Sequence, residues 1–484
     1  MLPRSFLPSL LGLAVLAGPA AAAPAHASRT FRAGAATSNI TPQLGGGLGA
    51  GPGSPHARHI HDELHVRCLA LDDGTTKLVF AVVDRVGVNR EAVDDAKRRL
   101  QEATGLPPEN VMISATHSHR GARRANAMGS GTPPDDYETF MVGRIVDGIR
   151  RALNNLEPAR IGWGAGQVPQ HVFNRRWLLR DGKTVTNPFG GQDRAMTNQW
   201  SHPDRDRPAG PVNPEVFIIS VESTGGRPIA LLANYWLHYA GTGMPETHIS
   251  ADYFGAFADR IQELLGADRQ DPPFVGLLAN GPCGDVNHLG YPFPEGHKLV
   301  PYERVRLVSN DVAQEVMRVR RTTVHRDWVE LKAAAADLPL QARRPTPAMV
   351  ARAKAILARP ATVAPIVRRE VDYARRTLAA LEWPKAFVVP LQTFRIGELG
   401  VAAIPFETFT ETGLEIKARS PFRDTFTVEL ANGGYGYLPT PEQHELGGYE
   451  TWLGTNRVEK EATVKIVGKI LDLFGRVQGE EAAR

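Results

Sequence analysis

The chain has 484 residues, of which 42% are hydrophobic and 22% are charged, a composition typical of a soluble globular protein. The formal net charge is +4, and the arginines are scattered among acidic residues, so the sequence lacks the clustered basic surface typical of nucleic-acid-binding proteins. Beyond the N-terminus no apolar run reaches the roughly 18 residues of a membrane-spanning helix, which argues against stable membrane insertion.

The first 27 residues read as a secretory signal peptide. Arg4 gives the positive start, residues 6–18 form an apolar core, and small residues ending at Ala23 or Ala27 provide a cleavage site. We therefore expect an exported protein, either secreted or periplasmic, whose mature chain begins at residue 28.

Two cysteines, Cys68 and Cys283, both lie in apolar segments. With no CxxC motif, a cysteine-based zinc site is excluded. An oxidising compartment permits a disulfide between them, and the alternative is two buried free thiols.

One pattern occurs three times along the chain, over residues 64–119, 215–285 and 387–437. Each copy has an apolar strand, a turn with Gly, a second strand, an amphipathic helix and a further strand. Because strands so uniformly apolar are usually covered on both faces, we expect an α/β fold. The expected core is a large mixed β-sheet, or two packed sheets, flanked by helices and built from three strand-strand-helix-strand units.

The segments between and after these units predict further features. We expect a helix over residues 137–156, a polar loop over 174–213 that is long enough to wall a binding site, two helices over 345–383 broken around Pro360 and Pro365, and a closing helix over 459–477. Since no interdomain linker separates them, residues 28–484 are expected to form a single domain.

Polar side chains recur where the strands of these units end. In open α/β sheets, sites gather at the carboxyl ends of strands. The second strands end at Asp84, His238 and Glu407, and the last elements of the units end at His117 and His119, at Asp285 and Asn287, and at Tyr435 and Tyr437.

Two histidines and one carboxylate form a catalytic zinc set that leaves a position for water. A metal held there lowers the pKa of its water toward ~7 and polarises a carbonyl, which suits hydrolysis of an amide or ester. Singly, each residue has a structural alternative: His238 could be a hydrogen-bonded strand end, and Glu407 could favour a helix N-terminus. The histidine-rich segment 56–65 is interpreted as a loop that runs into a strand.

Several segments together resemble the neutral ceramidase family. They are "ATSNITP", "HDELHVRCLALDDG", "ISATHSHRG", "NYWLH…HISADYFG", "NGPCGDVNH", "IPFETFTETGLEIK" and "LANGGYGYLPTPEQHELGGYE", and they extend from about residue 33 to 475. Members of that family are exported zinc amidases that cleave the N-acyl bond of ceramide.

The resemblance implies a role for particular residues. It implies one zinc ion ligated by His117, His238, Glu407 and Tyr437. His119 is implied to be a proton donor or substrate contact, Tyr449 to hydrogen-bond the developing oxyanion, and Arg175 to be the site arginine, although Arg176 is adjacent.

In the segment "GDVNH", which holds Asp285, Asn287 stands where the family has a serine. The chain also ends where the family adds a C-terminal β-sandwich domain.

We therefore expect an exported zinc hydrolase that acts on an amide or ester bond of a small-molecule or lipid-like substrate, with Glu407 or His119 relaying the proton. The arginine-rich loop and Trp177 favour a polar or anionic substrate over a lipid with two tails. One alternative is a zinc hydrolase of another bond, such as a lactone or a glycoside derivative. The other is a secreted binding protein without catalysis, which Asn287 favours and the complete ligand set opposes.

Overall fold

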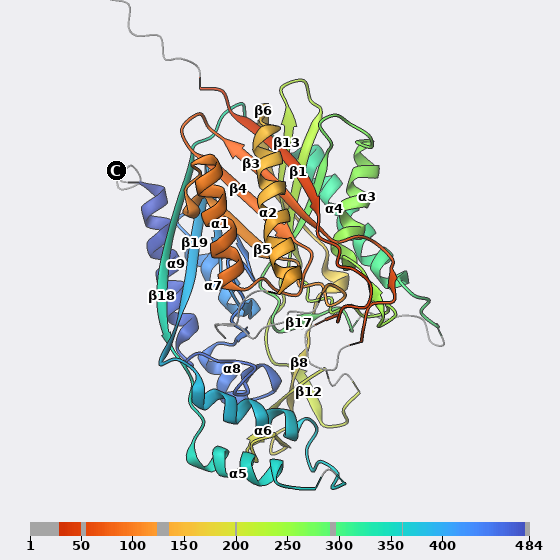
Figure 1. Cartoon of the computed structure of the whole chain (residues 1–484), viewed down its shortest axis with the longest axis vertical. Helices are drawn as coiled ribbons and strands as arrows, with labels where there is room; N and C mark the ends of the chain where they lie inside the picture. Colours follow the sequence, from red (N-terminus) through yellow and green to blue (C-terminus); the bar gives the residue numbers. More distant parts are fainter. Residues whose placement is uncertain are drawn as a thin grey trace, which may run out of the picture.

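A computed structural model describes residues 29–49, 55–122, 135–198, 201–290, 297–360 and 362–479 of the chain. Two β-sheets form its centre (Figure 1). The larger sheet has, in order, β16 (Val275–Asn280), β14 (Pro228–Tyr235), β13 (Glu215–Ser223), β6 (Glu157–Gln167), β1 (Arg32–Asn39), β3 (His65–Asp72), β4 (Lys77–Val83) and β5 (Val111–Ala115). The smaller has β18 (Leu331–Gln341), β19 (Ala386–Ile396), β20 (Leu399–Ala403) and β22 (Asp424–Val428).

The three predicted units are confirmed, and they share one topology. In each, an antiparallel hairpin is followed by a helix that leads into a strand parallel to the second one. The units are β3-β4-α1-β5, β13-β14-α3-β16 and β19-β20-α7-β22, where α1 is Arg90–Thr104, α3 is Asp252–Leu265 and α7 is Thr410–Arg419. The first two units occupy opposite ends of the larger sheet, and the third forms most of the smaller one.

The predicted α/β fold with a large mixed sheet flanked by helices is confirmed, and the smaller sheet packs face to face on the larger one. Phe80 meets Phe394 edge-on with ring centroids 5.3 Å apart, and Phe217 lies 5.1 Å from Phe426. Such rings bury large apolar areas, and these four join strands of both sheets in one core. The outer face of the larger sheet is covered by α1, α2 (Asp136–Asn154), α3 and α4 (Glu303–Thr322), and that of the smaller sheet by α7 and α9 (Ala462–Gln478).

Two of the predicted insertions, the 174–213 segment and the helices over 345–383, lie at one end of the stack of two sheets and their covering helices (Figure 1). The 174–213 segment forms a small sheet of β8 (Arg176–Leu179), β11 (Ala195–Thr197) and β12 (Arg205–Pro208). The helices α5 (Pro347–Leu357) and α6 (Glu370–Ala379) form a hairpin with its own apolar contacts, between Ile356 and Ala374 among others. Figure 1 shows this hairpin at the end of the molecule farthest from α1 and α2.

Cys68 and Cys283 are both buried and free, which is the second of the two alternatives for this pair. The expected signal peptide, residues 1–27, lies outside the described residues. Among the helices that the structure describes, none has the length and apolar character needed to cross a bilayer.

Candidate metal centre

Three histidines converge where strands of the larger sheet end. His117 and His119 follow β5, and His238 follows β14. The Nε2 atom of His119 lies 3.3 Å from Nε2 of His117 and 3.2 Å from Nε2 of His238. His117 has φ 66°, a left-handed conformation that is uncommon outside glycine and is concentrated at functional sites.

The segments that follow β20 and β22 of the smaller sheet add a carboxylate and a phenol to this cluster. Two short strands, β21 (Glu407–Thr408) and β23 (Tyr437–Leu438), pair in parallel, which places Glu407 beside Tyr437. Oε2 of Glu407 lies 3.3 Å from Nε2 of His117. The cluster therefore forms where the carboxyl ends of strands from both sheets meet.

Glu407 and His117 stabilise each other's charged forms. Burial alone would lower the pKa of His117, but the Glu407 carboxylate outweighs it and raises that pKa. Burial would likewise raise the pKa of Glu407, but His117 and a hydrogen bond from Tyr437 lower it. Burial raises the pKa of Tyr437 well above its usual value, so its phenol stays protonated.

His119 and His238 are held neutral. Burial and the neighbouring His117 lower the pKa of His119 to about 3 and that of His238 well below its usual value. Neutral imidazoles are the metal-binding form of histidine. Ligand atoms of His117, His119 and His238 all lie within 4.8 Å of one another, so this group could hold a metal ion.

A second test of fit is the outer nitrogen of each ring, which in a metal-bound histidine donates a hydrogen bond. Nδ1 of His117 meets this condition, because it lies 2.7 Å from the backbone oxygen of Val86, so a metal ion would replace the proton that Nε2 shares with Glu407. Glu407 offers its oxygen to the same Nε2. The donor set of imidazoles and one carboxylate is that of catalytic zinc sites.

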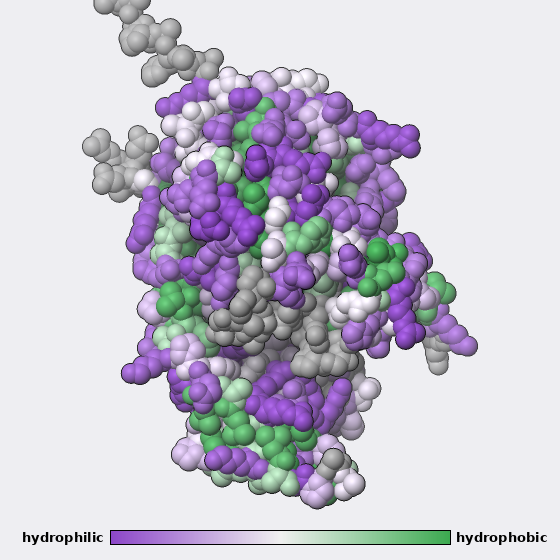
Figure 2. Space-filling model, in the orientation of Figure 1, coloured by the Kyte–Doolittle hydropathy of each residue, from purple (hydrophilic) through white to green (hydrophobic). Residues whose placement is uncertain are grey.

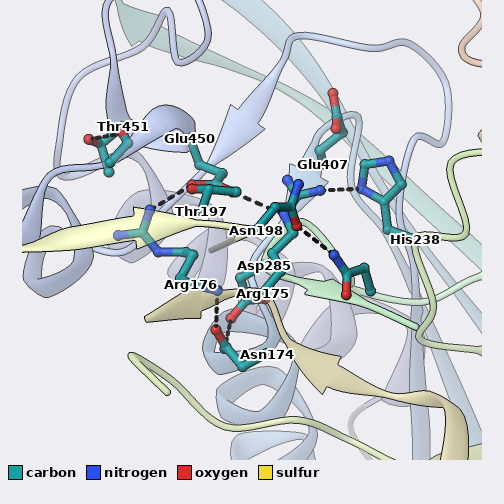
Figure 3. Close-up of polar contacts among 12 residues, drawn as sticks. Asn174, Arg175, Arg176, Thr197, Asn198, His238, Asp285, Glu407, Glu450 and Thr451 are labelled. Atoms are coloured by element: carbon teal, nitrogen blue, oxygen red, sulfur yellow. Dashed lines mark hydrogen bonds and ion pairs between the residues drawn. The ribbon is translucent and has the colours of Figure 1, made fainter. Parts of the chain in front are cut away.

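Arg175 contacts this cluster from the 174–213 segment (Figure 3). Its Nη1 donates to Nδ1 of His238 at 2.9 Å, and its guanidinium lies 5.2 Å from the ring centroid of Tyr437. Its Nη2 is buried and has no hydrogen-bond partner among the described residues. Arg175 thus brings a fixed positive charge and a spare donor beside the histidines.

Arg176 points away from the cluster, which settles which of the two adjacent arginines faces it (Figure 3). Its guanidinium donates to Gln443, to the backbone oxygen of Gly447 at 2.7 Å and to Oε2 of Glu450 at 2.7 Å. The side chains of successive residues in extended backbone lie on opposite sides, which explains the divergence.

Glu450 connects the two arginines and was not found from the sequence. It is fully buried, and its Oε1 accepts from Nε of Arg175 at 3.0 Å while its Oε2 accepts from Arg176 and from Thr197. Burial would raise the pKa of Glu450, but the two guanidinium groups lower it, so it is ionised. Its position directly after Tyr449 is the only signal that could have indicated it.

Tyr449 lies at the border of the cluster. It is half-buried, and its ring centroid is 5.6 Å from that of Tyr437. On the other side, the Arg369 guanidinium lies 5.2 Å from its centroid. The structure thus brings Tyr449 next to a proposed ligand and next to α6.

Asp285 lies beside Arg175, whose backbone N–H donates to its backbone oxygen at 2.8 Å, and Asn287 follows two residues later. Both oxygens of the Asp285 carboxylate are used: Oδ1 accepts from the backbone and hydroxyl of Thr410, and Oδ2 accepts from Asn174 at 2.8 Å. Asn287 donates to Asn198 at 2.6 Å. Their contacts position the start of α7 and the 174–213 segment, and a direct part in chemistry stays a prediction.

The other strand-end and histidine candidates serve the fold. Asp84 is buried and paired with Arg67, and the Tyr435 hydroxyl donates to a backbone oxygen of β19. His59 lies in the short strand β2 (His59–Ile60), which pairs with β15 (His248–Ile249), so the histidine-rich segment does enter a strand.

Comparison with known proteins fits this geometry. Residues 31–290 match the family described as neutral/alkaline non-lysosomal ceramidase, N-terminal. The chain belongs to this family. The matched residues include the three histidines and Arg175, while Glu407, Tyr437 and Tyr449 follow them.

Solved structures confirm the family's fold over nearly the whole chain. A neutral ceramidase from Pseudomonas aeruginosa is 18% identical with a TM-score of 0.69, and the match covers 92% of this chain and 74% of that one. A ceramidase complexed with C2 is 17% identical with a TM-score of 0.69, covering 93% and 76%. This family member therefore has a ceramidase-like hydrolase fold that extends well beyond residue 290.

Proposed function

We propose that the chain is an exported, zinc-dependent hydrolase that cleaves an amide (N-acyl) or ester bond. The observation that carries the proposal is the convergence of His117, His119 and His238 with the Glu407 carboxylate at the meeting point of the two sheets. Export is supported by the signal-like sequence of residues 1–27.

One zinc ion per chain is proposed, held by His117, His238, Glu407 and Tyr437, with His119 within reach of the same position. A bound zinc ion acts as a Lewis acid and makes water a nucleophile near neutral pH. His117 is the best-prepared ligand, because Val86 already fixes its proton on Nδ1.

The remaining residues act on protons and on the substrate. Glu407 is ionised and His119 is neutral, so either group can accept a proton from water and later donate it to the leaving amine or alcohol. Arg175 has a buried donor without a partner, and Tyr449 has a hydroxyl at the border of the cluster. We assign both to the negative charge that develops on the carbonyl oxygen.

For the substrate we propose a lipid-like N-acyl compound, since the relatives of this fold are ceramidases. The site geometry supports carbonyl chemistry, and the ceramidase relationship favours an amide over the lactone and glycoside alternatives.

The first experiment is the metal content of the purified mature protein, measured by elemental mass spectrometry without added metal. We expect close to one zinc per chain in the wild type and its loss, together with turnover of N-acyl and ester substrates, in Glu407→Ala. The matched control is Glu415→Ala on the exposed side of α7, which should keep both. Full zinc occupancy in Glu407→Ala would refute the ligand assignment.

A further inference from the structure

Several aliphatic side chains are exposed around the turn of the α5–α6 hairpin. Leu357, Val363 and Ile366 are 37%, 50% and 81% exposed there, although single exposed aliphatic residues are usually scattered. Hydrogen bonds from Val363 to Pro360 and from Ile366 to Glu370 fix the chain in this exposed arrangement. Figure 2 shows apolar side chains among charged ones over this end of the molecule.

The same hairpin is strongly basic. Residues 343–376 contain nine arginines and lysines but only two acidic residues. Glu370 is engaged by Arg359 and Arg352, and Asp372 by Arg369 and Arg376. Exposed Lys354, Arg368 and Arg375 have no ion-pair partner among the described residues, so their positive charge faces solvent.

We propose that this turn docks the protein on an anionic lipid bilayer. The aliphatic side chains would enter the boundary between headgroups and acyl chains, while Lys354 and Arg368 would pair with anionic headgroups. Their long apolar stems allow a charged end to stay at that depth. Aliphatic residues that project from a turn and are flanked by free cations complement such a surface in both hydrophobicity and charge.

The hairpin also contacts the border of the candidate metal centre. Arg369, next to Arg368, lies over the ring of Tyr449, and Tyr373 of α6 meets Trp452 edge-on at 5.1 Å. Docking at the turn would therefore bring the Tyr449 side of the site toward the bilayer. This would serve the proposed hydrolase by delivering membrane-soluble substrates, but the docking itself does not depend on catalysis.

The test is co-sedimentation of the mature protein with phosphatidylcholine vesicles that contain about 30% phosphatidylglycerol, and with pure phosphatidylcholine vesicles. We expect binding to the anionic vesicles that weakens in high salt, because exposed charges are screened. Lys354→Ser with Arg368→Ser should weaken it about thirtyfold, at about 1 kcal/mol per charge. Val363→Ser with Ile366→Ser should weaken it at least tenfold.

Matched controls are Arg321→Ser and Val324→Ser at the end of α4, where Arg321 is exposed and Val324 is 72% exposed. They should bind like the wild type. Glu407→Ala should also bind fully, so a failure of the hydrolase proposal is separable from a failure of this one. The inference is overturned if the protein does not bind anionic vesicles or if the control substitutions weaken binding equally. It is also overturned if an acidic protein binds as tightly as the vesicles and the aliphatic substitutions do not weaken that binding.

Discussion

Arg175 donates a hydrogen bond to Nδ1 of His238, and this contact decides where that imidazole carries its proton. A guanidinium is always charged and can only donate, so neutral His238 must hold its proton on Nε2, the atom that faces His119. A metal ion on Nε2 needs the opposite tautomer. The contact with Arg175 requires the proton of His238 on Nε2, whereas the proposed metal requires it on Nδ1. Arg175 and the metal therefore compete for His238.

Removal of Arg175 should accordingly separate metal affinity from turnover. Arg175→Ala frees Nδ1 of His238 and removes a positive charge, so we expect zinc to bind about tenfold tighter, equivalent to a lost charge-assisted hydrogen bond. Turnover should fall at least a hundredfold, because a donor to the carbonyl oxygen is lost. Competition with a chromophoric chelator measures the affinity, and Arg175→Lys keeps the charge as a control. Weaker zinc binding in Arg175→Ala would show that Arg175 supports the ligand set instead.

Glu450 should be needed to hold Arg175 in place. Glu450→Gln leaves two buried guanidinium groups without their counter-charge, for which losses of about 3–5 kcal/mol of stability are typical. In the protein that remains folded, kcat should fall more than KM rises, because Arg175 is proposed to act on charge in the transition state. Urea denaturation and steady-state kinetics give the two values. Glu445→Gln, which loses an exposed pair with Lys460, should change neither.

Glu429 should make the protein less stable as the pH rises. It is buried against Cys283 and the backbone of Thr408, and burial raises its pKa to about 8. Between pH 4.5, the ordinary pKa of a glutamate, and about pH 8, Glu429 keeps a proton in the folded chain that it has released in the unfolded chain. The free energy of unfolding then falls by as much as about 1.4 kcal/mol per pH unit across this window.

The variant Glu429→Gln reproduces the shape and hydrogen bonding of the protonated acid. We expect it to match the wild type near pH 5 and to exceed its stability by a few kcal/mol at pH 9, measured by urea denaturation at both values. Since other buried acids titrate in both proteins, the difference between the two isolates Glu429. A constant difference across this range would contradict the assigned protonation state.

Asp285 should contribute to stability more than to chemistry. Its carboxylate accepts three hydrogen bonds that join Thr410 at the start of α7 to Asn174. Asp285→Ala should cost about 3 kcal/mol, since buried donors lose their acceptor. Residual turnover per folded molecule should stay within tenfold of the wild type, as active-site titration with a tight-binding inhibitor would show. A complete loss of turnover at unchanged stability would instead make Asp285 part of the chemistry.

The repeated units could be predicted from the sequence because β4, β14 and β20 are largely apolar and each is followed within four residues by a polar side chain, Asp84, His238 or Glu407. His238 and Glu407 came from that pattern. Arg175 came from the family resemblance alone, because alternation predicts that Arg175 and Arg176 diverge but not which of the two meets His238. Glu450 was missed because its partners lie far away in the sequence, and no local pattern reports a contact of that kind.

The site draws its imidazoles from the first two units and its carboxylate from the third, so it exists only once the whole chain has been made. A nascent or clipped chain that ends near residue 290 would carry His117, His119 and His238 but neither Glu407 nor Tyr437. Such a fragment should lack the proposed activity, because the ligand set would be complete only after the third unit has packed onto the first two.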